Sequence, residues 1–127
     1  MNVVDSCGWL EYFGNGPNAY FFAPAIEDEA QLLVPALVVY EVSRKLTVER
    51  GAEGEQRGIA FLKRGRFVVL DFAQMRDAAL SSQQHKLAMA DAIIWQTAQA
   101  HHATLYTQDA AFKGLPGVRF KATGGKK

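Results

Sequence analysis

Two aspartates stand where a predicted strand gives way to a helix or a loop. Asp5 ends the β-rich run MNVVD, and Asp109 follows the run ATLYT in the segment LYTQDAAF. In open parallel sheets, side chains just beyond the carboxyl ends of strands line the crevice where ligands bind. Each aspartate also has a structural interpretation, because an Asp before a helix caps the backbone N–H groups of the first turn. The sequence thus predicts two helix caps, two carboxylates at one crevice, or both.

Glu41 lies on the otherwise apolar face of a predicted helix. In the segment PALVVYEVSRKL it falls four residues after Leu37 and three after Val38, on one stripe of a 3.6-residue repeat. The alternative is a surface glutamate paired with Arg44 or Lys45, an arrangement that adds roughly a few tenths of a kcal/mol.

Asp91 lies in the apolar part of HKLAMADAIIWQTAQAHH, residues 85–102, on one stripe with Leu87, Ile94 and Ala98. Burying an unpaired carboxylate costs several kcal/mol, so a core-facing Asp91 needs a proton, a cationic partner or a metal. The alternative is an acid in the first turn of a helix that begins near Met89, where the macrodipole favours it by about 0.3–1 kcal/mol.

Together these acids would form a cluster of like charges that raise one another's pKa and that cations would stabilise. A set of carboxylates is the ligand choice of Mg²⁺ or Mn²⁺, which leave coordination positions open for water and substrate phosphate. The chemistry of such a site is metal-assisted phosphodiester hydrolysis. The predicted site consists of Asp5, Glu41, Asp91 and Asp109.

The elements that must position these acids alternate between strand and helix. Strands are expected at residues 1–5, 31–35, 66–72, 103–107 and 117–120. Helical segments are expected at 6–13, at 19–30 with a kink or split at Pro24, at 36–50 with Pro35 opening and Gly51 closing it, at 57–65, and over 73–102. This alternation predicts an α/β fold with a parallel sheet of four to five strands and helices on both faces.

The bulk composition is that of an ordinary globular protein. The 127 residues suit a single domain, and with 49% hydrophobic and 21% charged residues no window is apolar enough to span a bilayer. The start lacks the pattern of a secretion signal and the single cysteine, Cys7, has no disulfide partner, so we expect a cytoplasmic protein. The first 56 residues hold nine acids and three Lys or Arg, whereas the remainder holds four acids and eleven Lys or Arg. This asymmetry suits a polyanionic substrate but also an ordinary solvated surface.

The segments VVDS, YEV, ADAIIWQTA and LYTQDAAF, in this order and spacing, resemble PIN-domain ribonucleases over nearly the whole chain. The chain length is similar to that of the VapC toxins of toxin–antitoxin pairs. The resemblance implies a PIN-like nuclease domain over residues 1–122. Residues 123–127 are expected to form a frayed basic tail, as chain ends often do. The resemblance also implies cleavage of cellular RNA such as tRNA with Mg²⁺ or Mn²⁺, a cognate antitoxin that blocks the cleft, and a homodimer. The implied catalytic and metal-binding residues are Asp5, Glu41, Asp91 and Asp109, with Ser6 and Thr107 supporting them through hydrogen bonds.

Two departures from the family pattern stand out. Cys7 occupies a position where many relatives carry a second hydroxyl, and DAAF offers only alanines where some relatives have another acidic or polar residue after Asp109. We therefore expect one firmly held ion rather than two. The rival hypotheses are a phosphatase or phosphoacceptor domain, whose first strand would normally carry paired acids, and a degenerate PIN-like module that binds RNA or protein without cutting.

Other residue groups have simpler interpretations. The histidines are interpreted as polar residues at helix ends, since their spacing does not suit a zinc site. The aromatic residues of the N-terminal region are expected in the core or at a protein interface. Candidate contacts to an RNA backbone, each more simply explained as a solvated charge, are Arg44, Lys45, Lys63, Arg64, Arg66, Lys86 and Lys113.

Overall fold

The computed structural model describes residues 1–124, and within them the strands form a five-stranded sheet in which every neighbouring pair is parallel. The strand order is β3-β2-β1-β4-β5. The predicted α/β class is confirmed, including the fifth strand. The strands are β1 (Asn2–Val4), β2 (Leu32–Pro35), β3 (Arg66–Val68), β4 (Thr104–Thr107) and β5 (Val118–Phe120).

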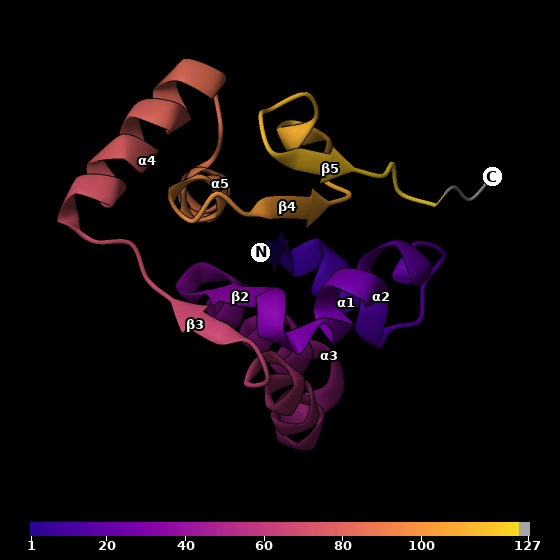
Figure 1. Ribbon diagram of the computed structural model, residues 1–127. Helices are drawn as coiled ribbons and strands as arrows, with labels where there is room; N and C mark the ends of the chain where they lie inside the picture. Colours follow the sequence, from indigo (N-terminus) through magenta and orange to yellow (C-terminus); the bar gives the residue numbers. More distant parts are fainter. Residues whose placement is uncertain (125–127) are drawn as a thin grey trace.

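The helices cover both faces of the sheet. Figure 1 shows α1, α2 and α3 on one side and α4 and α5 on the other. This division follows from the strand order, because the chain must cross over β2 and β1 to pass from β3 to β4. The helices are α1 (Ser6–Phe13), α2 (Ala19–Glu27), α3 (Ala36–Leu62), α4 (Phe72–His85) and α5 (Met89–Ala100), with 3₁₀ turns at Glu29–Gln31 and Ala110–Phe112.

The core lies on either side of the two central strands. Val3 and Val4 of β1 and Leu105 of β4 are fully buried, as expected for parallel strands covered on both faces. Trp9 of α1 and Ile94 of α5 are equally buried and approach the sheet from opposite sides. The central strands are therefore held rigidly, and their carboxyl ends are fixed relative to each other.

Several helix boundaries agree with the sequence. Asp5 is the N-cap of α1 and Gly14 ends that helix. Gly51 has φ +73° and ψ −175° and interrupts α3, so the predicted stop at this residue is confirmed. Only glycine adopts this backbone region readily. Helical structure resumes after Gly51, and residues 52–56 begin the following helical segment.

Other boundaries were predicted wrongly. Pro35 is the last residue of β2 and the cap before α3, with an extended ψ of 149°, rather than a first-turn residue of the helix. Pro24 lies inside α2 without splitting it, although this helix ends at Glu27, earlier than expected. The third strand stops at Val68, because Asp71 caps α4: it accepts from the Gln74 N–H while its own N–H donates to the Gln74 side chain, in a capping box.

The segment 85–102 is not part of one continuous helix. Lys86 adopts the left-handed conformation with φ 57° and ends α4, and α5 begins at Met89. The Ser82 hydroxyl donates to the Leu87 carbonyl at 2.7 Å, and Leu87 is buried in the break. Asp91 consequently lies in the first turn of a new helix rather than in the middle of a long one.

Two expectations about the chain as a whole remain. In residues 1–124, no helix is both long and apolar enough to cross a membrane. Of the predicted frayed tail, residues 125–127 lie outside the described residues, so the proposed boundary at 122 remains a prediction.

Candidate active site

Asp5 is held at the end of β1 by three hydrogen bonds to its carboxylate. Oδ1 accepts from the Ser6 backbone N–H at 2.8 Å, and Oδ2 accepts from the Thr107 hydroxyl at 2.9 Å and from the Cys7 thiol at 3.3 Å. Burial raises the pKa of Asp5, the three hydrogen bonds oppose this shift, and the nearby charge of Glu41 adds to it. Asp5 is thus both a helix cap and a buried carboxylate at the carboxyl end of a central strand, so its two interpretations are compatible.

Glu41 approaches the same place from α3. Its Oε1 accepts a hydrogen bond from the Ser6 hydroxyl at 2.5 Å. The alternative surface ion pair is not found in the described part of the chain, where Lys45 instead pairs with the exposed Glu49 at 3.6 Å. Ser6 therefore links two carboxylates, because its backbone N–H binds Asp5 and its hydroxyl binds Glu41.

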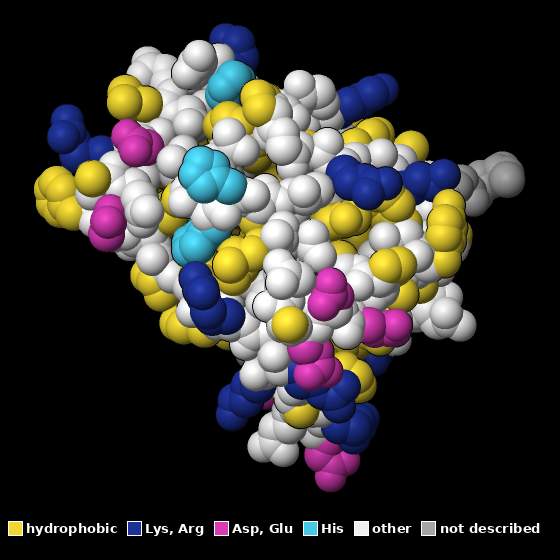
Figure 2. Space-filling model, in the orientation of Figure 1, with side chains coloured by type: hydrophobic (Ala, Val, Ile, Leu, Met, Phe, Trp, Pro, Cys, Tyr) yellow, Lys and Arg dark blue, Asp and Glu magenta, His cyan; other side chains and the backbone are white. Residues whose placement is uncertain are grey.

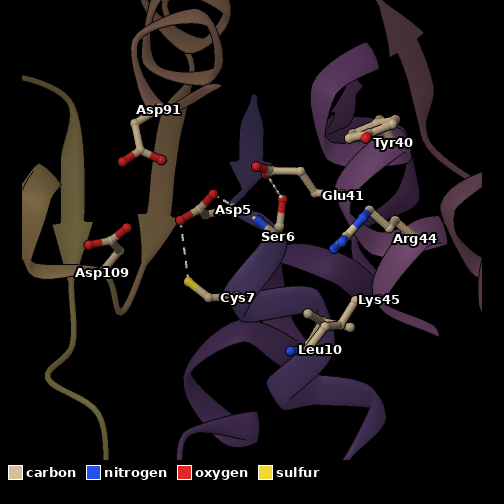
Figure 3. A pocket seen from close by; sticks show the side chains of 10 residues that line it. All are labelled: Asp5, Ser6, Cys7, Leu10, Tyr40, Glu41, Arg44, Lys45, Asp91 and Asp109. Carbon is tan, nitrogen blue, oxygen red and sulfur yellow. Dashed lines mark hydrogen bonds between the residues drawn. The ribbon is translucent and has the colours of Figure 1, made fainter. Parts of the chain in front are cut away.

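Asp91 is half-buried, and its carboxyl is exposed to three negative neighbours. Its pKa is raised to about 6 by burial first, and then by the charges of Asp5, Asp109 and Glu41. The first-turn interpretation of Asp91 is correct as to its place in the helix. It does not exclude a role in the site, because the same position directs the carboxyl toward the other acids (Figure 3).

Asp109 completes the set from the loop after β4. Its Oδ1 accepts from the Ala111 N–H at 2.9 Å and caps the short 3₁₀ turn that follows. Its own N–H donates to the Thr107 hydroxyl at 2.9 Å. Thr107 therefore bridges two of the predicted site residues, since its hydroxyl accepts a hydrogen bond from the Asp109 N–H and donates one to the Asp5 carboxylate.

These side chains share one open pocket of about 640 Å³. Figure 3 shows Asp91 and Asp109 on one wall and Ser6 and Glu41 on the other, with Asp5 between them. The pocket lies at the carboxyl ends of β1 and β4, where the strand order reverses, which is the usual ligand position in an open parallel sheet. Its lining is Asp5, Ser6, Cys7, Leu10, Tyr40, Glu41, Arg44, Lys45, Asp91 and Asp109.

The donor set suits a hard divalent cation. Four carboxylates line the pocket, and in residues 1–124 none of them forms a salt bridge with Lys or Arg. Burial raises the pKa of the Cys7 thiol to about 12, so this sulfur stays protonated and the available charged ligands are all oxygens. Within the same residues no three acidic, His or Cys side chains are arranged to enclose a metal ion. The site thus fits Mg²⁺ or Mn²⁺ in its chemistry, and the carboxylates would have to converge to bind the ion.

The surroundings of the acids are basic on one side. Figure 2 shows acidic side chains near the middle of one face of the molecule and Lys and Arg side chains next to them toward α3. Arg44 and Lys45, two of the seven candidate RNA contacts, line the pocket itself. Arg64 lies over the Phe61 ring at 4.4 Å and pairs with Glu29, away from this pocket.

A known protein family matches most of this chain. The model of the PIN domain matches residues 3–118, which include all four acids. The chain belongs to the PIN domain family. The resemblance seen in the sequence is thus confirmed at the level of the family. No curated protein matches this chain in a sequence search.

Solved structures share the fold of this PIN domain at low sequence identity. A toxin–antitoxin complex from Klebsiella pneumoniae is 24% identical with a TM-score of 0.78, covering 94% of this chain and 96% of the other. Mycobacterium tuberculosis VapC20, described as a toxin that cleaves the sarcin–ricin loop, is 13% identical with a TM-score of 0.75 and coverages of 93% and 97%. Rickettsia felis VapBC2, bound to a DNA fragment from its promoter, is 17% identical with a TM-score of 0.71 and coverages of 95% and 97%.

Sequence reasoning missed part of the pocket of this PIN domain. Leu10 and Tyr40 line it, and neither was considered as a site residue. Tyr40 could have been found, because it directly precedes Glu41 and lies one helical turn before Arg44. The predicted helix-end role of the histidines is consistent with His101, whose Nδ1 lies 2.9 Å from the Thr97 carbonyl at the end of α5, and with His85, which packs edge-on against Trp95 at 5.2 Å.

Proposed function

We propose that this PIN domain is a metal-dependent endoribonuclease whose catalytic and metal-binding residues are Asp5, Glu41, Asp91 and Asp109. One observation carries the proposal: carboxylates from two strand ends and two helices line a single pocket without a cationic side chain paired to any of them in residues 1–124. Gathering like charges in this way is unfavourable unless a cation joins them. A purely structural role for the acids does not explain why four elements contribute one each.

Mg²⁺ or Mn²⁺, held by these carboxylates, would supply Lewis-acid activation of water and of the phosphodiester. The chain's own groups prepare the site for this chemistry. Thr107, Cys7 and the Ser6 N–H fix the orientation of the Asp5 carboxylate, and the Ser6 hydroxyl fixes that of Glu41. Ser6 and Thr107 are therefore positioning residues in this proposal. Asp91, whose pKa is raised to about 6, holds a proton more readily than an ordinary carboxylate.

The biological setting we propose is a toxin–antitoxin pair. Several solved structures of the same fold are toxin–antitoxin complexes, and VapC20 is described as a toxin that cleaves the sarcin–ricin loop. The substrate is accordingly proposed to be cellular RNA, with tRNA as one candidate, and an antitoxin is proposed as the inhibitory partner. The homodimer and the cytoplasmic location implied by the sequence remain predictions.

The second candidate is a PIN-like module that binds RNA or a protein without cutting it. One observation favours this alternative: in residues 1–124, no three acidic, His or Cys side chains are arranged to enclose a metal ion. It predicts RNA or partner binding that is indifferent to divalent ions.

The test compares the purified protein with Asp91→Asn on total RNA, with Mg²⁺ or Mn²⁺ and with EDTA. We expect cleavage that requires the metal and that the substitution lowers by at least about a hundredfold, since it removes a ligand and a charge from the site. Asp77→Asn, which changes an exposed acid on α4, is the matched control and should cleave normally. Binding of RNA without cleavage by the wild type under every metal condition would favour the non-cutting module instead.

A further inference from the structure

Tyr40 is an exposed aromatic side chain at the edge of the candidate active site. It lies in the second turn of α3, directly before Glu41, and 64% of its surface is exposed although it lines the pocket. Figure 3 shows it on the same wall as Glu41 and Arg44, across from Asp91 and Asp109. In the free protein this ring is therefore largely exposed to water beside a cluster of carboxylates.

Tyr40 differs from the other tyrosines in its lack of partners. Among residues 1–124, its ring packs against no other aromatic ring or cation, and its hydroxyl forms no hydrogen bond. By contrast, Tyr12 bonds Glu27, Tyr20 lies under the Lys121 ammonium, and Tyr106 packs on Phe21. The fold therefore does not use the ring of Tyr40, although it uses the others.

Arg44 lies one helical turn after Tyr40 and lines the same pocket. Residues four apart on a helix are neighbours on one face, with about 5–6 Å between their Cβ atoms. Lys45, the other cation of this pocket, is paired with Glu49 at 3.6 Å, whereas Arg44 forms no salt bridge in residues 1–124. Arg44 is thus the pocket cation that is available to bind an anionic group of a ligand.

We propose that Tyr40 and Arg44 form a subsite for one unpaired nucleotide next to the phosphodiester that is cut, with the base stacked on Tyr40 and a phosphate bound by Arg44. An aromatic face combined with a guanidinium is the pair of groups that recognises single-stranded nucleic acid, because every base has a π-face and every linkage a charge. Bases inside a duplex are already stacked and cannot reach the ring. This inference deepens the proposed function and rests on it: it assigns Tyr40 and Arg44 as the residues that hold the nucleotide beside the cut.

The substitutions that test this subsite should change the folding stability only slightly. Because Tyr40 is exposed and has no partner among the described residues, Tyr40→Ala should leave the urea midpoint of unfolding close to that of the wild type. Tyr40→Phe keeps the ring and removes only the hydroxyl. Tyr20 on α2 is equally exposed at 64% but does not line the pocket, so Tyr20→Ala is the matched control.

The experiment measures binding of a short unpaired RNA strand carrying the fluorescent base 2-aminopurine. It is done with Mg²⁺ in the Asp91→Asn background, so that the strand stays intact if the proposed function is correct. We expect Tyr40→Ala to weaken binding roughly 5- to 100-fold and to abolish the quenching of the stacked 2-aminopurine, whereas Tyr40→Phe and Tyr20→Ala bind normally. Arg44→Gln should also weaken binding, and the same strand annealed to its complement should compete poorly. With Asp91 restored, Tyr40→Ala should raise KM more than it lowers kcat.

The outcomes separate this inference from the proposed nuclease. If Tyr40→Ala binds and cleaves RNA as the wild type does, the subsite is wrong while the nuclease stands. Tyr40-dependent binding of the unpaired strand, together with a wild type that never cleaves, keeps the subsite and rejects the nuclease. If Tyr40→Ala impairs only the capture of a protein partner and leaves RNA binding unchanged, the ring serves that partner and the subsite is overturned. Equal binding of unpaired and duplex RNA overturns it as well.

Discussion

The hydroxyl of Thr107 donates a 2.9 Å hydrogen bond to Oδ2 of Asp5, although the two residues are 102 positions apart in the chain. The contact exists because β1 and β4 are adjacent and parallel in the sheet, so that their carboxyl ends coincide. Thr107 is fully buried, and its oxygen also accepts from the Asp109 N–H. A single hydroxyl thus fixes an acid on one strand relative to an acid that follows the next strand.

Replacing this hydroxyl should affect both stability and activity. Thr107→Val keeps the shape of the side chain but leaves the Asp109 N–H without its acceptor and the Asp5 carboxylate without one of its three donors. We expect a loss of about 1–3 kcal/mol of unfolding free energy, measured by urea denaturation, and slower RNA cleavage. Thr107→Ser should restore most of both. Thr104→Val on the same strand is the control, and an equal loss in that variant would contradict a specific role of Thr107.

The raised pKa of Asp91 predicts a pH-dependent effect on stability in metal-free protein. Its pKa is about 6 in the folded protein against an ordinary value of 3.8, so the folded state holds this proton more tightly than the unfolded chain does. Stability from this group is therefore present below the unfolded value and is lost as pH rises through the range from 3.8 to about 6.

Asp91→Asn removes the titration, so its stability relative to the wild type should increase between about pH 4 and about pH 7.5. The measurement is urea denaturation of both proteins in EDTA at the two pH values. Asp77→Asn, at an exposed site on α4, should show no such change. A stability difference that is independent of pH would mean that neither burial nor the neighbouring acids raise the pKa of Asp91.

The position of the four acids around one pocket could be predicted from the sequence, because strand ends and helix faces follow from simple periodicities. Asp5 and Asp109 lie beyond parallel strands, and a five-stranded sheet with β1 beside β4 brings them to the same edge. The reason given for Asp91 was partly wrong. A continuous apolar stripe from Leu87 was expected, but Leu87 lies in the break before α5, and of that stripe only Ile94 and Ala98 are buried residues of this helix.

What could not be predicted depends on single backbone and side-chain conformations. The break ends α4 at Lys86 in a left-handed conformation, where neither a glycine nor a proline marks the stop. The 2.5 Å bond from Ser6 to Glu41 depends on rotamers in two elements. The exposure of Tyr40 depends on the rotation of α3 about its axis, which the apolar pattern fixes only coarsely because Leu37 and Val39 are half-buried and Val38 is fully buried.

Divalent cations should stabilise the folded protein if the four carboxylates bind them together. The unfolded chain has no such site, so a ligand at about 100 times its Kd adds about 2.7 kcal/mol to the unfolding free energy. We expect Mg²⁺ or Mn²⁺ to raise Tm relative to EDTA in the wild type and to raise it much less in Glu41→Gln, which loses one ligand. Glu53→Gln, an exposed acid farther along α3, is the matched control. Equal shifts in the wild type and Glu41→Gln would show that the cation binds elsewhere.

The last prediction concerns Cys7, whose thiol donates to the Asp5 carboxylate at 3.3 Å from a partly buried position. Its pKa is raised from 9.0 to about 12, first by burial and then by the Asp5 charge, so very little of the reactive thiolate exists near neutral pH.

Because the chain has a single cysteine, the rate of alkylation by iodoacetamide reports on this residue alone. At about pH 8 we expect the folded protein in EDTA to react at least about a hundredfold more slowly than the urea-unfolded protein. Asp5→Asn removes the neighbouring charge and should speed the reaction of the folded protein, provided that its urea midpoint shows that it remains folded. A fast reaction in the folded wild type would mean that the thiol is neither buried nor held beside the Asp5 charge as the structure has it.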